Sequence, residues 1–139
     1  MHTEENIIKK FHPHPLLFLG FYLGGFILAL VGFAISKPLA SIGILVIVLG
    51  EISRLAETFY ITDGGVVQEY KFLTTHRKFA EYRRIQNIEV RQSFLENIFG
   101  IGNIYFDTAG ADKTEVNFRG VNHPYKIEKI VREKMTLAG

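Results

Sequence analysis

Cysteine is absent from all 139 residues of the chain. Its absence excludes disulfide bridges, thiolate catalysis and cysteine-ligated metals, and it fits a reducing cytoplasmic environment. The chain also lacks low-complexity tracts and internal repeats. From residue 57 onward neither sign of charge dominates, because 12 Lys and Arg stand against 11 Asp and Glu, a balance of +1. We therefore expect no nucleic-acid binding, for which a strongly basic face is required.

Long apolar runs are present, and both lie in the first half of the chain. The first, 16–35, has no acidic or basic side chain in 20 residues, and about 20 such residues form a helix that spans the roughly 30 Å of bilayer hydrocarbon. The second, 39–50, is shorter, but its apolar face continues past Glu51 and Arg54. Pro38 suits the first turn of a helix. The sequence therefore predicts two membrane-spanning helices, 16–35 and 38–56.

The connection between these two helices, Ser36-Lys37-Pro38, has only three residues. So short a connection returns the chain across the bilayer, and the two helices therefore form a transmembrane hairpin. Lys9, Lys10 and Arg54 flank its open end, against Lys37 alone in the connection, and positive residues favour the cytoplasmic side. We expect an integral protein of the cell membrane with both termini cytoplasmic. Its parts are a cytoplasmic tail (1–15), the hairpin (16–56) and a soluble domain (57–139).

After the hairpin the pattern changes from helical to alternating, which is typical of β-strands. Asp63-Gly64-Gly65 is a tight turn whose glycines tolerate positive φ, and Ala109-Gly110-Ala111-Asp112 is a second glycine-bearing turn. The alternation places Ile88, Val90 and Phe106 on the inner face. The expected strands are 58–62, 66–72, 77–82, 85–92, 103–107 and 115–119.

A helix is expected to close the chain. Asn122-His123-Pro124 is a helix start signal with a capping residue and an early proline. Beyond it, Ile127, Ile130, Val131 and Met135 fall on one apolar stripe, with charged pairs on the opposite face. Antiparallel strands followed by one amphipathic helix predict an α+β domain, a rolled sheet that the helix closes at one end.

Five short segments carry a family resemblance. They are Tyr60-Ile-Thr-Asp63, Arg84-Ile-Gln-Asn-Ile-Glu-Val-Arg-Gln-Ser93, Ile98-Phe-Gly-Ile-Gly102, Thr108-Ala-Gly110 and Gly120-Val-Asn-His-Pro124. In this order they resemble the bacterial PH-like domain family, also called membrane-flanked domain proteins, over about residues 58–137. Members commonly carry a preceding two-helix hairpin. The resemblance implies a PH-like fold in a prokaryotic membrane protein, and it implies little chemistry.

Lipid headgroups are one ligand class that the resemblance raises. PH domains elsewhere often bind phosphoinositides through basic residues that flank the loop between the first two strands. We assign that loop to Asp63-Gly64-Gly65, which is acidic and too short to cradle a phosphate, so no specific phosphoinositide is expected. The domain has one basic cluster, Arg77, Lys78, Arg83 and Arg84. These side chains either rest on anionic lipid, at about 1 kcal/mol each, or line a solvated strand face.

Small residues recur at helical spacing in both predicted spans. Gly20 and Gly24 form one small-x-x-x-small pair, Gly25 and Ala29 form another, and Gly43 offers a small face on the second helix. Such residues let helix backbones approach closely in a membrane. They pack the hairpin against itself or against a second copy of the chain, and we favour the first use.

The sequence gives only weak evidence for a metal site or a phosphate site. His2, His12 and His14 could supply imidazoles, and His12 and His14 form a compact pair. Neither a carboxylate nor a third histidine stands at fixed spacing from this pair in a rigid element, so no metal site is expected. Gly100-Ile-Gly102 lacks the remainder of a phosphate-binding motif and is interpreted as a sharp turn into the next strand.

Charged residues at the end of the second helix form another candidate site. Glu51, Arg54 and Glu57 lie three residues apart, and we expect an interfacial ion-pair ladder that ends the span and stiffens its link to the domain. Neither a Ser-His-Asp order nor a paired-carboxylate motif is recognisable, so no enzymatic activity and no cofactor are expected.

These observations predict a membrane-tethered PH-like interaction or scaffold module. It would bind a protein partner or assemble with itself at the cytoplasmic face of the membrane. The alternative is an anionic-lipid-binding protein or a membrane transport accessory protein. That alternative requires an acyl-sized apolar pocket or a polar path through the bilayer.

Overall fold

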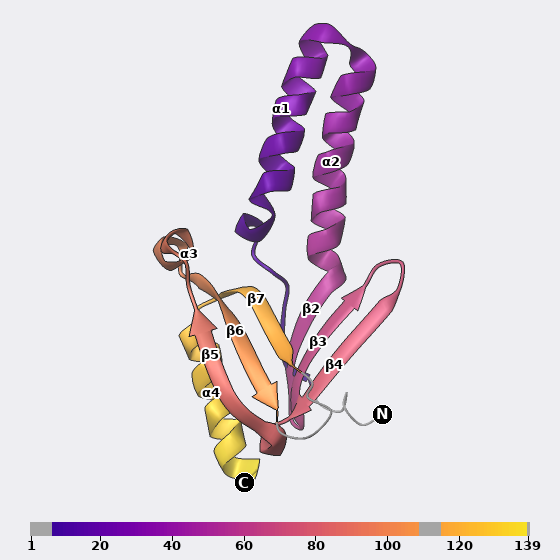
Figure 1. Ribbon diagram of the computed structural model, residues 1–139. Helices are drawn as coiled ribbons and strands as arrows, with labels where there is room; N and C mark the ends of the chain where they lie inside the picture. Colours follow the sequence, from indigo (N-terminus) through magenta and orange to yellow (C-terminus); the bar gives the residue numbers. More distant parts are fainter. Residues whose placement is uncertain (1–6, 109–114, 139) are drawn as a thin grey trace.

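The computed structural model describes residues 7–108 and 115–138, so His2 and the turn expected at 109–112 lie outside the described residues. The elements are β1 (Ile7–Phe11), η2 (Pro15–Phe18), α1 (Leu19–Ile35), α2 (Lys37–Ala56), β2 (Glu57–Thr62), β3 (Gly65–Lys71), β4 (Thr75–Glu81), η3 (Tyr82–Arg84), β5 (Ile85–Arg91), α3 (Phe94–Phe99), β6 (Ile101–Thr108), β7 (Val116–Asn122) and α4 (Pro124–Ala138). Figure 1 shows α1 and α2 as a hairpin that rises from one end of two sheets.

The predicted α+β arrangement is confirmed. All six expected strands are present, and their ends differ from the expected ones by at most three residues. Within the described residues the strands form two antiparallel sheets, β1-β2-β3-β4 and β5-β6-β7. Helix α4 packs against η3, β5 and β6, as Figure 1 shows in yellow. Two antiparallel sheets and a C-terminal helix make the domain PH-like.

Strand β1 lies in the segment that we expected to be a tail. Its residues pair antiparallel with β2, with Lys10 opposite Tyr60 and Phe11 opposite Phe59. The apolar hairpin is therefore the connection between the first two strands of a sheet. Strand β1 has only five residues, and two of them are lysines. So short and polar a pattern does not predict a strand from the sequence alone.

The core lies between the two sheets, where three phenylalanine rings pack among isoleucine and valine side chains. Phe118 stacks on Phe59 with ring centroids 5.0 Å apart and meets Phe106 edge to face at 5.1 Å. Ile88 and Phe106 are buried and Val90 packs against the same core, so the predicted strand register is confirmed. The predicted apolar stripe of α4 also faces the core, through Ile127, Ile130, Val131 and Met135.

Helix α3 lies directly before the sharp turn expected at 100–102, in a segment for which no helix was predicted. Ser93 and Glu96 form a reciprocal capping box, in which each side chain accepts a hydrogen bond from the other residue's backbone N–H. Gly100 ends the helix in the left-handed region with φ of 71°. The glycine thus has the turn role expected from the sequence, but it closes a helix that the short pattern did not reveal.

Candidate functional site: the hairpin and its junction with the domain

Close backbone approach joins the two helices of the hairpin. A Cβ atom added to Gly43 would lie 2.6 Å from the carbonyl oxygen of Gly25 and would overlap the backbone nitrogen of Ala29. A Cβ atom on Gly25 would in turn lie 2.6 Å from Cγ1 of Ile47. These three small residues therefore hold α1 and α2 in contact, which is the use that we favoured from the sequence.

The other small pair of α1 faces away from α2. Gly20 and Gly24 are exposed, and a Cβ atom on either would meet no atom within 4 Å. Two further glycines complete the helix contact, since a Cβ atom on Gly32 would overlap the backbone of Ala40 and one on Gly50 would lie 2.6 Å from Cβ of Phe21. The candidate helix-packing residues of α1 are thus divided between two of its faces.

A polar network ties the open end of the hairpin together. The Tyr22 hydroxyl of α1 donates to Glu51 Oε1 of α2 at 2.7 Å, and Arg54 Nη2 donates to Glu51 Oε2 at 2.6 Å. Arg54 Nη1 also donates to the carbonyl oxygen of Pro13 at 3.1 Å. The arginine therefore connects the second helix to the segment that enters the first, and Tyr22 connects the two helices directly.

The expected ladder of three charges is only partly present. Glu51 and Arg54 pair as expected, but Glu57 turns into the domain, where Arg119 Nη2 on β7 lies 2.5 Å from its Oε1. The side chain of Glu57 is only 7% exposed. It turns inward because β2 begins at Glu57, so the helical spacing that would place it beside Arg54 has ended. Arg119 could not be identified from the sequence, since no local pattern links residues 62 positions apart.

The two described histidines of the N-terminal segment bind backbone atoms near this junction. His12 Nδ1 donates to the carbonyl oxygen of Glu57 at 3.0 Å, and His14 Nδ1 accepts from the Leu16 N–H at 3.1 Å at the start of η2. Within 7–108 and 115–138, no group of three His, Cys, Asp or Glu side chains is arranged to hold a metal ion. Both rings therefore position the chain on its way into the hairpin.

The basic residues singled out in the sequence do not lie together. Arg77 and Lys78 are on β4, opposite Glu69 and Gln68 of β3, and Arg77 Nη1 donates to Glu69 Oε2 at 3.1 Å. Arg83 and Arg84 belong to η3, which begins where the Tyr82 N–H donates to the Gly64 carbonyl oxygen. That turn is at the end of the sheet away from the hairpin. Contact of the basic residues with anionic lipid stays a prediction.

The turn at Asp63 and Gly64 connects β2 to β3, and Gly65 already belongs to β3. Our assignment of 63–65 to the loop between the first two strands is therefore wrong, because β1 had been missed. The segment in that position is the apolar hairpin itself. The absence of a specific phosphoinositide site stays a prediction, and it now concerns a domain whose first interstrand connection is helical.

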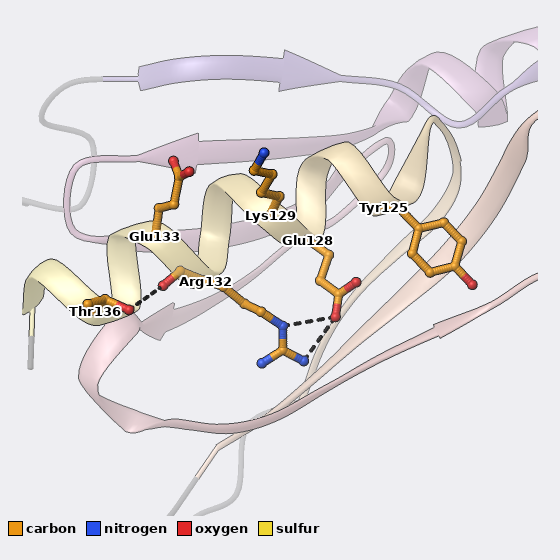
Figure 2. Close-up of a pocket in the computed structure, with 6 residues that line it drawn as sticks. All are labelled: Tyr125, Glu128, Lys129, Arg132, Glu133 and Thr136. Carbon is orange, nitrogen blue, oxygen red and sulfur yellow. Dashed lines mark hydrogen bonds and ion pairs between the residues drawn. The ribbon is translucent and has the colours of Figure 1, made fainter.

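The outer face of α4 bears a shallow groove of charged side chains (Figure 2). Arg132 is paired with Glu128 at 2.9 Å one turn away, and Lys129 and Glu133 point to the other side of the helix. Tyr125 stands at the start of the helix, 59% exposed. All six residues that line the groove belong to α4.

Comparison with known proteins gives a family match. A family model described as a bacterial PH domain matches residues 15–135, a range that includes both apolar helices and the domain to near the end of α4. Neither curated proteins nor solved structures gave a significant match to the chain.

Proposed function

The chain belongs to the bacterial PH domain family, and from this premise we propose that it is a membrane-tethered, non-catalytic interaction module. Its hairpin crosses the cell membrane twice and holds the PH-like domain at the cytoplasmic face. There the domain binds a protein partner or a second copy of the chain.

The pairing of β1 with β2 carries the proposal. These strands lie directly before and after the hairpin, and Phe11 is opposite Phe59 in their ladder. Strands in one ladder must lie on the same side of a membrane, so a helix pair between them has to cross it twice or not at all. Both helices are long and apolar enough to cross, and their outward side chains are apolar and exposed.

The filled interior of the domain favours surface binding over lipid carriage. Phe59, Phe106 and Phe118 are fully buried between the sheets, so they occupy the space that an acyl chain would require. Tyrosine is one of the residues enriched at the energetic centres of protein interfaces, and Tyr125 on α4 is exposed. The outer face of α4 is therefore the surface that we assign to the partner.

Two measurements on cells that produce the full chain test this function. The protein should stay in the membrane fraction after an alkaline wash, which removes peripheral proteins. A photoreactive residue in place of Tyr125 should crosslink to one discrete protein or to a second copy, and the same residue in place of Gln86 on β5 should not.

Release by the alkaline wash would contradict the membrane tether. Equal crosslinking from both positions, or crosslinking to lipid alone from Tyr125, would contradict the partner surface and would favour the anionic-lipid alternative.

A further inference from the structure

Helix α3 exposes its whole apolar face. Phe94, Leu95, Ile98 and Phe99 are each more than half exposed, Phe94 at 80%. At 100° per residue these four side chains share one side of the helix. Glu96 lies on the other side, where Ser93 and Asn103 bind its carboxylate. The helix thus turns its polar side to the domain and its apolar side outward, which is the reverse of a helix that packs on its own core.

The turn between β3 and β4 is a second exposed apolar tip. Phe72 is 46% exposed and Leu73 is 87% exposed. The Phe72 N–H donates to the carbonyl oxygen of Thr74 at 3.1 Å, which fixes a tight turn with both side chains at its end. Turns are usually polar, so two large apolar residues at the tip indicate a surface that meets an apolar phase.

Both tips lie where the hairpin meets the domain. Leu95 on α3 and Leu16, Leu17 and Leu19 at the start of the hairpin line one shared hollow. Tyr70 pairs with Glu57, the first residue after α2, so the turn that follows Lys71 lies beside the last turn of α2. Figure 1 shows α3 and the β3–β4 loop at the same end of the domain, on either side of the two helix bases.

Lipid fits this surface better than a protein does. The two tips flank the two points at which the chain enters and leaves the hairpin, which on the proposed function is the level of the hydrocarbon boundary. Phenylalanine and leucine are the residues that enter this interfacial layer, and Lys71 beside one tip can reach the headgroups. A protein at both tips would have to displace lipid from around the same helices.

We propose that α3 and the β3–β4 turn insert their apolar side chains into the interfacial layer of the membrane on either side of the hairpin. The domain then rests on the bilayer at three points and does not swing freely on its two helices. This inference rests on the proposed function, because the spans define where the membrane lies.

The absence of cysteine allows a direct test with single-cysteine variants of the full chain. A small fluorophore is attached to Leu73→Cys and Ile98→Cys in nanodiscs of phosphatidylethanolamine and phosphatidylglycerol. The lipids carry bromine, which quenches on contact, either near the headgroup or at the chain end. Ile27→Cys in α1 reports on the span, and Lys129→Cys on α4 is the exposed control.

The expected result is strong quenching at Leu73 and Ile98 by the lipid brominated near the headgroup, weaker quenching by the other lipid, and none at Lys129. Adding Phe72→Ser or Phe94→Ser should reduce quenching at the label in the same tip, which shows that the native side chains and not the dye drive insertion. Ile27 should be quenched in every variant.

Quenching at Ile27 without quenching at Leu73 and Ile98 would overturn this inference and leave the membrane tether intact. A blue-shifted emission at the tips without quenching would mean that protein covers them, and this too would overturn it. Absence of quenching at Ile27 would instead contradict the proposed function itself.

Discussion

Phe11 and Phe59 lie opposite each other in neighbouring antiparallel strands, although both apolar helices separate them in the chain. Phe11 also contacts Phe118 of the second sheet, with ring centroids 6.3 Å apart. The hairpin is thus built into the domain between two strands that share its core. Any movement of the helix bases is transmitted to the sheet through two strands and not through one flexible linker.

Substitution at Gly43 should separate the two helices. Gly43→Leu places a side chain against the backbone of Gly25 and Ala29, and overpacking of this kind costs about 1–3 kcal/mol or more. Spin labels at Leu30 and Leu45, in a variant with cysteine at both positions, should report a longer interhelix distance. Gly24→Leu is the matched control, since a side chain there meets no atom within 4 Å. An equal change in both variants would mean that the helices do not pack through Gly43.

Truncation of the aromatic core should destabilise the domain strongly. Phe106→Ala should cost about 3–5 kcal/mol and Ile88→Ala about 2–5 kcal/mol, because both side chains are buried between the sheets. Hydrogen exchange of the β6 amides in the full chain measures the loss. Leu137→Ala on α4, where the side chain is 83% exposed, should change exchange little, and a comparable effect there would contradict the core assignment.

Replacing Arg119 should destabilise the domain more than replacing Glu57, its partner in the ion pair. Arg119→Met leaves the buried carboxylate of Glu57 without its main partner, and an unsatisfied buried polar group costs about 1–3 kcal/mol. Glu57→Gln removes the charge as well as the pair, and it should therefore cost less. Thermal unfolding of both variants and of the double variant decides the order. A larger loss for Glu57→Gln would show that the carboxylate is not effectively buried.

Tyr82 should make the domain sensitive to alkaline pH. Burial raises the pKa of its hydroxyl to about 12, with a further contribution from the negative charge of Asp63, whereas tyrosine in an unfolded chain has a pKa of about 10. A raised pKa in the folded state means that stability is complete below pH 10 and falls as the pH rises toward about 12.

The Tyr82→Phe variant tests this dependence. It loses the hydrogen bond to the Thr62 carbonyl oxygen, which is 2.5 Å long, so it should be less stable at neutral pH. Its denaturation midpoint should fall less steeply above pH 10, the remaining slope coming in part from Tyr60, whose pKa burial also raises. An unchanged slope would show that Tyr82 ionises alike in the folded and unfolded chain.

Local patterns predicted most of the fold. The alternation around Asp63 and Gly64 identified β2 and β3, and the stripe from Ile127 to Met135 identified α4, because each element shows its period within its own length. Strand β1 was missed because its partner follows only after two helices, and α3 was missed because six residues are less than two helical turns.

Contacts between side chains that are distant in the sequence were the other feature that could not be predicted. Gly25, Ala29 and Gly43 could be chosen from small-residue spacing, since both helices show that spacing separately. The partner of Glu57 could not, because Arg119 reaches it through the closure of two sheets. The basic residues at 77–84 looked like one cluster because they are close in sequence. In the fold Arg77 and Lys78 lie in the middle of the extended strand β4, whereas Arg83 and Arg84 belong to the turn that follows it.

The central claim, a membrane hairpin between two paired strands, is tested most directly by the accessibility of single cysteines to a membrane-impermeant maleimide. Lys37→Cys lies in the helix connection, and Ile8→Cys on β1 and Thr136→Cys on α4 lie on either side of the hairpin in sequence. The account predicts that Lys37→Cys is labelled in intact cells and that the other two are labelled only in inverted membrane vesicles. Labelling of Ile8→Cys and Thr136→Cys from opposite sides, or of all three from the same side, would contradict it.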